Sequence, residues 1–112
     1  MCTQDKLKRI LSLVADSYRK VYGEDIVEIV LYGSYARGDN TDESDIDLVA
    51  IVHGNRPELQ DKLKAVWDAT AEIGLEYDVV VSPTVVPYDE FLRYRESLPY
   101  YRNIREEGIR VG

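Results

Sequence analysis

The sequence is poor in sulfur and has no long apolar run. Cys2 is the single cysteine among 112 residues, which excludes an internal disulfide and a cysteine-rich zinc site. No apolar run approaches the roughly 20 residues that a membrane-spanning helix needs. The N-terminal residues MCTQDKLKRI lack the apolar core of a signal peptide. These absences favour a cytoplasmic protein, where thiols stay reduced.

Basic residues are also scarce relative to acidic ones. The chain has 14 Lys and Arg against 21 Asp and Glu, giving a formal net charge of −7. Nonspecific nucleic-acid binding depends on basic surfaces that release counterions, so no stable nucleic-acid binding is expected. A nucleotide carried together with metal ions remains compatible with this charge.

The length and the apolar content predict one small domain. A chain of 112 residues, 45% of them hydrophobic, can build a core but has no room for a second ordinary domain. We therefore expect a single domain over residues 1–112. Because so short a chain has little surface with which to enclose a large substrate, we expect a partner to present or complete it.

The hydrophobic periodicity predicts alternating helices and strands. Glycines and prolines mark the ends: Gly23 and Gly74 stop two helices, and Pro83 and Pro87 bracket an extended connector. The order α-β-β-α-β-α indicates an α/β domain with a small mixed sheet flanked by helices. The expected elements are helix 3–22, strand 25–32, strand 45–52, helix 57–73, strand 76–82 and a helical tail over 88–108 interrupted near Pro99. Trp67 lies beside the apolar face of its helix and is expected in the core.

Two acidic residues begin the second strand. Asp45 and Asp47 are two positions apart in DIDLVAIV, so their side chains leave the same face, about 7 Å apart along the strand. Neither has a Lys or Arg beside it in the sequence, and like charges on one face repel. A divalent cation would make the pair favourable, and oxygen-only ligands point to Mg²⁺ or Mn²⁺. For each residue alone, helix capping or a solvated strand end is the alternative.

A third carboxylate is expected nearby. Asp78 interrupts the apolar run YDVVV, and a lone charge in a buried strand is costly unless it is paired or metal-bound. If its strand neighbours the second one, three carboxylates converge and suit two metal ions. Alone, Asp78 would be explained equally well by a strand end near water.

A phosphate-binding corner is predicted just before this cluster. Gly33 lets the backbone approach a ligand closely, and Ser34 adds a hydroxyl donor. Arg37 can neutralise phosphate charge, although pairing with Asp39, Asp42 or Glu43 is an alternative. A glycine–serine pair by itself is more often an ordinary tight turn.

The stretch GSYARGDNTDESDIDLVAIV resembles the signature of polymerase-β-like nucleotidyltransferases. More narrowly, residues 33–48 are similar to the pattern GSxARGDxxxxSDxDL of the minimal nucleotidyltransferases, without a gap. Asp78 resembles the third carboxylate of that family, and the tail PYYRNIREEG resembles its ending. The similarity therefore spans nearly the whole chain and implies the polymerase-β-like nucleotidyltransferase fold.

The resemblance implies transfer of AMP from ATP with release of pyrophosphate. It implies that Gly33 and Ser34 hold the triphosphate and that Asp45 and Asp47 bind both Mg²⁺ ions. Asp78 would bind the catalytic metal and help to deprotonate the acceptor hydroxyl. Many minimal members are antitoxins that modify a tyrosine of a HEPN-domain ribonuclease toxin, so such a toxin is the partner that the resemblance implies.

Two alternatives remain open at this stage. Nucleotide transfer to a small molecule such as an aminoglycoside uses the same chemistry, but similar enzymes usually carry an added helical domain. An antitoxin that neutralises its partner by contact alone would need no catalysis, whereas this motif keeps its carboxylates. The tail is rich in Tyr and Arg, which suits either an interface or a helix docked on its own sheet.

Overall fold

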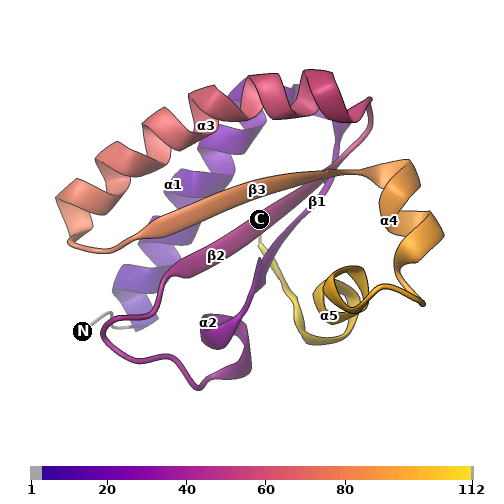
Figure 1. Cartoon of the computed structure of the whole chain (residues 1–112). Helices are drawn as coiled ribbons and strands as arrows, with labels where there is room; N and C mark the ends of the chain where they lie inside the picture. The colour runs from indigo at the N-terminus through magenta and orange to yellow at the C-terminus, as the bar shows by residue number, and fades with distance from the viewer. Residues whose placement is uncertain (1–3, 112) are drawn as a thin grey trace.

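The computed structural model describes residues 4–111, which form a four-stranded sheet with helices on both faces (Figure 1). The strand order is β3-β2-β1-β4; β1 is antiparallel to β2 and β4, and β2 is parallel to β3. This mixed sheet confirms the predicted α/β fold. The elements are α1 Gln4–Tyr22, η1 Gly23–Asp25, β1 Ile26–Tyr32, α2 Ser34–Arg37, β2 Ile46–Val52, α3 Arg56–Tyr77, β3 Val81–Pro87, α4 Tyr88–Tyr94, α5 Pro99–Glu107 and β4 Ile109–Val111.

The larger core lies between the sheet and the helices α1 and α3. Ile10, Val14 and Tyr18 recur every four residues along α1 and are fully buried there, as this helical spacing predicts. Leu48 and Ala50 of β2 point into the same cluster. Because side chains alternate along a strand, the intervening residues of β2 must face the opposite side of the sheet.

The opposite face is covered by α4 and α5 over part of its length. Val49 and Ile51 of β2 pack there with Phe91 of α4 and Ile104 of α5. The tail therefore docks on its own sheet through these apolar residues. Asp47 lies on this face as well, because it alternates with Leu48, and it is half-buried at the end of β2 where the chain enters the sheet.

The third strand lies at residues 81–87, and the prediction of 76–82 was wrong. Helix α3 continues to Tyr77, and Asp78 caps it in the left-handed conformation with φ of 55°. Gly74 lies inside this helix and does not end it. A Cβ on Gly74 would lie 2.6 Å from the carbonyl oxygen of Val79, so glycine lets the chain turn back closely over the last helical turn.

Pro83 and Pro87 belong to β3, contrary to their predicted place in a connector. Proline is tolerated because β3 is an edge strand whose ladder is completed by side chains. The Leu48 carbonyl, opposite Pro83, accepts a hydrogen bond of 3.0 Å from the Thr84 hydroxyl. The Tyr18 hydroxyl accepts from the Thr84 N–H at 3.1 Å and donates to the Thr84 carbonyl at 2.8 Å.

Two further features of the sequence were misjudged or missed. Trp67 is 46% exposed, so its predicted place in the core was wrong. The buried face of α3 runs through Val66 and Thr70, and Trp67 is one position, about 100° around the helix, away from Val66. Strand β4 was not predicted, because a three-residue element carries too short a pattern. None of the helices in residues 4–111 combines the length and the apolarity needed to cross a membrane.

Candidate active site

The glycine and aspartate parts of the motif meet at one edge of the sheet. Tyr32, the last residue of β1, is the register partner of Asp47 in β2, so the chain leaves the sheet beside Asp47. Gly33 follows with φ of 76° and ψ of −154°, a conformation open essentially to glycine alone. A Cβ on Gly33 would lie 2.6 Å from Asp47 Oδ2. The antiparallel hairpin therefore places the predicted phosphate corner against the predicted metal corner.

Asp47 sits in a distinct electrostatic environment. Burial raises the pKa of its carboxyl, and the neighbouring Asp45 raises that pKa further. Arg37 opposes both effects and lowers it. Asp45 itself lies just before β2 and is exposed. The three side chains thus act on one another, and a cation placed between the two carboxylates would relieve their repulsion.

The loop between β1 and β2 is ordered by its own hydrogen bonds. The backbone N–H groups of Ala36 and Arg37 both donate to the Gly33 carbonyl at 3.1 Å. Nearer β2, the Thr41 N–H donates to Ser44 Oγ at 2.8 Å and the Ser44 N–H returns to the Thr41 carbonyl at 3.1 Å. These contacts fix both ends of the loop, and Ser44 orders the approach to Asp45.

Arg37, at the end of α2, forms ion pairs with two carboxylates. Its guanidinium contacts Asp39 at 3.3 Å and Glu107 of α5 at 3.6 Å. Pairing with Asp39 was the alternative to a phosphate role for this arginine. The side chain remains 45% exposed, and both ion pairs are surface pairs, which are weak. Arg37 can therefore exchange them for an incoming anion at low cost.

Asp78 lies beside the site but outside the expected cluster. It is exposed as the cap of α3, so the burial argument that singled it out was wrong. It lines a cavity of about 390 Å³ together with Asp42, Glu43 and Ser44 of the β1–β2 loop. Within residues 4–111, no group of three or more His, Cys, Asp or Glu side chains is arranged to hold a metal ion. The expected convergence of three carboxylates is thus absent from the described part of the chain.

The register places two residues beside Asp47 that the sequence did not single out. Tyr32 lies opposite it on β1, and Ser82 lies opposite it on β3. Burial raises the pKa of Tyr32, a hydrogen bond to Tyr100 raises it further, and Asp47 adds a smaller contribution. Strand alternation would have revealed Ser82 if the third strand had been placed correctly at residues 81–87.

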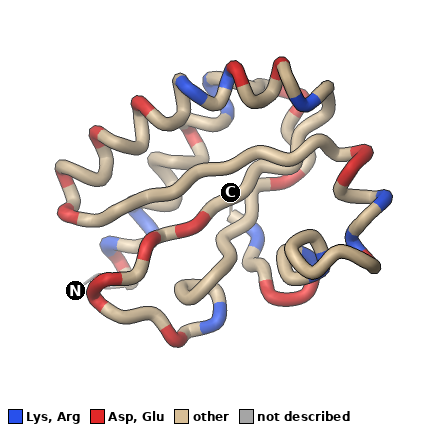
Figure 2. Tube along the Cα trace, viewed as in Figure 1, with Lys and Arg blue, Asp and Glu red and all other residues tan. Residues whose placement is uncertain are grey.

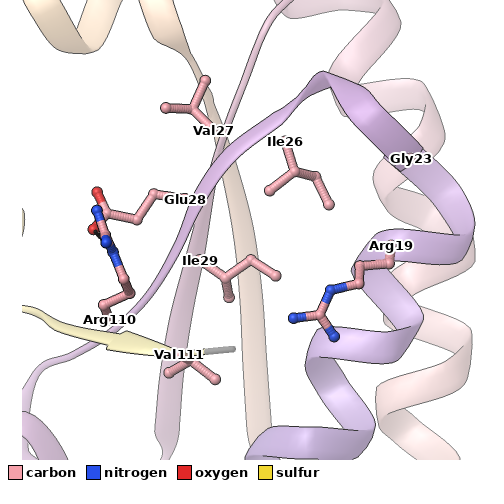
Figure 3. Close-up of a pocket in the computed structure, with 8 residues that line it drawn as sticks. All are labelled: Arg19, Gly23, Ile26, Val27, Glu28, Ile29, Arg110 and Val111. Carbon is pink, nitrogen blue, oxygen red and sulfur yellow. Dashed lines mark hydrogen bonds and ion pairs between the residues drawn. The ribbon is translucent and has the colours of Figure 1, made fainter.

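A second cavity lies away from this edge and contains none of the predicted residues (Figure 3). Its volume is about 370 Å³, and it is bounded by α1, the start of β1 and β4. Arg110 in its wall is paired with Glu28 at 2.8 Å, and Arg19 extends from α1 toward the strands. Its two arginines lie on opposite walls, and no carboxylate pair of the Asp45–Asp47 kind faces it.

The residues at the Gly33 edge suit a magnesium ion. Mg²⁺ in phosphoryl-transfer enzymes is usually bound by one or two carboxylates, with substrate phosphates and water completing the shell. Asp45 and Asp47 supply two carboxylates close enough to repel each other, and Gly33 leaves the space beside Asp47 free of a side chain. The donor set therefore fits Mg²⁺ together with a nucleotide.

Comparison with known proteins identifies the family of the chain. The profile of the nucleotidyltransferase domain matches residues 7–111. The chain belongs to this family. It is a nucleotidyltransferase, and its resemblance to the minimal members is confirmed.

Two similar proteins of known sequence have nearly the same length. One from Methanocaldococcus jannaschii, named "putative protein adenylyltransferase", is 32% identical over 108 residues, which are 96% of each chain. Another from the same organism and with the same name is 31% identical, covering 76% of this chain and 84% of the relative. A crystal structure of a toxin-antitoxin with AMP-PNP shares the fold at a TM-score of 0.54 and 14% identity, covering 89% of this chain and 70% of that one.

Proposed function

We propose that this nucleotidyltransferase moves AMP from ATP to a protein hydroxyl and thereby acts as an antitoxin. Its acceptor in this proposal is a tyrosine of a HEPN-domain ribonuclease toxin. The observation that carries the nucleotide chemistry is the space beside Asp47 that a Cβ on Gly33 would fill, which joins a phosphate corner to a carboxylate pair. The protein acceptor is supported by the relatives of nearly equal length that are named protein adenylyltransferases.

The reaction is an in-line displacement at the α-phosphorus of ATP. The acceptor oxygen forms a bond to that phosphorus, the bond to pyrophosphate breaks, and the hydroxyl proton passes to a carboxylate. Gly33, Ser34 and Arg37 would hold the triphosphate, because a glycine admits close approach and the guanidinium neutralises charge. Asp78 would accept the proton, from its place in the cavity wall beside Ser44.

Asp45 and Asp47 would hold the Mg²⁺ ions. Bound there, the ions would neutralise the phosphates and lower the pKa of the attacking hydroxyl. The protein's own contribution is to keep the two carboxylates together at the end of a buried strand. Ile46 between them is fully buried and anchors that end of β2 in the core.

The toxin partner is supported by size and by the fold. The domain described by residues 4–111 has a radius of gyration of 13.4 Å, too small to enclose a large acceptor. The toxin-antitoxin structure that shares its fold contains AMP-PNP, a nonhydrolysable ATP analogue. A domain of this fold therefore occurs in a toxin–antitoxin assembly crystallised with an ATP analogue.

The direct test is transfer of label from ATP to a candidate toxin. The chain is incubated with Mg²⁺, a HEPN-domain protein and ATP labelled at the α- or the γ-phosphate. Only the α-label should reach the toxin, and it should reach a tyrosine. Suppression of toxicity without any transferred label would reject the catalytic proposal.

The matched control is a double variant of the carboxylate pair, Asp45→Asn/Asp47→Asn. It removes both negative charges while keeping the shape of the side chains. Loss of transfer together with loss of protection would show that neutralisation needs catalysis. Full protection by the double variant would show instead that contact with the toxin suffices.

A further inference from the structure

Large apolar side chains gather on the surface between the second half of α3 and the start of β3. Leu75 is 86% exposed, Val80 is 58% exposed and Trp67 is 46% exposed. With Ala71 and Val79 they line a cavity of about 360 Å³, here called the α3–β3 groove. Single exposed apolar residues are ordinary, but a contiguous group around a concavity marks an interaction site.

The groove lies at a sheet edge that is poorly suited to strand addition. β3 is the edge strand on this side, and Pro83 and Pro87 remove two of its backbone donors. A partner would therefore be held by its side chains in the concavity and not by extension of the sheet.

The end of the groove nearest the candidate active site is acidic. Asp78 lies in its wall, Asp42 and Glu43 line the adjoining cavity, and the chain has no Lys or Arg from residue 65 to residue 92. Figure 2 shows acidic positions at the C-terminal end of α3 on the same side of the molecule as the acidic loop that enters β2. A second copy would bring like charges together across this surface, whereas a basic partner would complement it.

The groove is continuous with the candidate active site. Asp78, Val79 and Val80 line both the groove and the 390 Å³ cavity that contains Ser44. Ser44 is followed directly by Asp45. A segment seated in the groove would therefore run on toward the carboxylate pair.

We propose that the α3–β3 groove docks the acceptor protein through an apolar side chain flanked by Lys or Arg. The apolar side chain would fill the space beside Trp67, and a basic flank would pair with Asp78 and with Asp42 and Glu43 beyond it. The role of the docked protein as acceptor rests on the proposed function. The binding of a basic, apolar segment rests on the groove alone.

Trp67 is the sole tryptophan and reports on the groove directly. The probe is a synthetic amphipathic helix of leucine and lysine, compared with a leucine–glutamate peptide and a serine–lysine peptide of equal length. Only the leucine–lysine peptide should shift Trp67 emission to the blue and bind saturably. Equal binding of the serine–lysine or leucine–glutamate peptide, or no binding of any, would overturn the proposal.

Two double variants locate the binding. Leu75→Ser/Val80→Ser removes the apolar groove wall from exposed positions, so folding should be unaffected. Val27→Ser/Leu92→Ser removes two exposed apolar residues elsewhere as the control. Leu75→Ser/Val80→Ser should lower the affinity for the leucine–lysine peptide about 10-fold or more, which is the scale of losing one buried anchor. Val27→Ser/Leu92→Ser should leave that affinity unchanged. Equal effects of the two would overturn the proposal, as would self-association that the groove variant abolishes.

The same variants separate docking from the proposed function. Transfer of AMP to the candidate toxin should show a raised KM and an unchanged kcat in Leu75→Ser/Val80→Ser. Binding of a fluorescent ATP analogue with Mg²⁺ should be unchanged. Absence of transfer by the unaltered protein would reject the proposed function, whereas groove-dependent peptide binding would still stand. An unchanged KM in the groove variant would overturn the groove's role toward the acceptor.

Discussion

Gly33 faces Asp47 across the first hairpin so closely that a Cβ on Gly33 would lie 2.6 Å from the Asp47 carboxylate. Fourteen positions separate them in the sequence, and the antiparallel register of β1 and β2 brings them together. The glycine thus acts in two ways. It adopts a backbone conformation closed to other residues, and it leaves one side of Asp47 open to a ligand.

The variant Gly33→Ala should abolish transfer. The new Cβ would lie 2.6 Å from Asp47 Oδ2 and force the carboxylate to move. Because alanine is strained at this positive φ, the variant should also have a free energy of unfolding about 1–3 kcal/mol lower. Denaturant unfolding and the transfer rate are the two measurements.

Gly38→Ala is the matched control for that variant. Gly38 also has a positive φ, of 82°, but a Cβ there would meet nothing within 4 Å. It should lose about 1 kcal/mol of stability and keep most of its transfer activity. If both variants lost activity alike, the loss would come from the backbone conformation of the loop and not from a clash of the new Cβ with Asp47.

Asp78→Asn tests the proposed proton acceptor without disturbing the fold. Asparagine tolerates the left-handed conformation that this residue adopts at the end of α3, so the melting temperature should hardly change. Transfer should fall at least about 100-fold, the scale of losing a general base. Retained activity would show that Asp78 is a helix cap only and would reject its role as the proton acceptor.

Tyr18→Phe should destabilise the domain by about 1–3 kcal/mol. The lost hydroxyl leaves the Thr84 N–H without its acceptor at a place where Pro83 already interrupts the strand ladder. Tyr22→Phe is the comparison, since its hydroxyl donates only to the Leu59 carbonyl inside α3. Tyr22→Phe should lower the free energy of unfolding by less than Tyr18→Phe does. An equal decrease for the two variants in denaturant unfolding would contradict this account.

The contact between α3 and α4 should weaken in acid. A hydrogen bond from Arg56 is the main cause that lowers the pKa of Glu90, and a hydrogen bond from Tyr101 lowers it further. Because the folded-state pKa is depressed, the Glu90 contribution is present above the unfolded-state pKa. It is lost as the pH falls through the folded-state value.

Glu90→Gln gives the measurement for that interaction. The variant should be less stable than the unaltered protein at neutral pH, because it lacks the charged partner of Arg56. The difference in unfolding free energy should shrink as the pH is lowered below the ordinary carboxyl range. A difference that stayed constant from neutral to acidic pH would show that the charge of Glu90 contributes nothing.

Local patterns predicted much of the fold correctly. The spacing of Ile10, Val14 and Tyr18 fixes the buried face of α1, and the apolar runs around residues 26–32 and 46–52 form the two central strands. The start of α3 also has a local signal that the sequence prediction did not use, because Asn55 caps the helix by accepting from the Glu58 N–H at 3.0 Å. These features depend on neighbours within a few residues, and the sequence displays such neighbours directly.

The place of Asp78 and the register of β3 depend on distant parts of the chain. An apolar run with a proline after it predicts a strand ending at that proline, because an inner strand cannot lose a donor. In the folded protein the proline is accommodated by an edge position and by the hydroxyl of Tyr18, which is 66 residues from Thr84. The strand therefore continues past Pro83 to Pro87. Its start lies later than the pattern suggests because α3 continues to Tyr77, so Asp78 falls in the helix cap.

The sequence by itself determined the family, the two central strands and the motif that places Gly33, Asp45 and Asp47 in one short stretch. It did so because helices, strands and turns carry local signatures. The tertiary structure alone decided that Gly33 lies against Asp47, that Asp78 stands apart from the pair and that Trp67 faces solvent. Those relations depend on strand register and on which helix face is covered, and both are set by packing between distant segments.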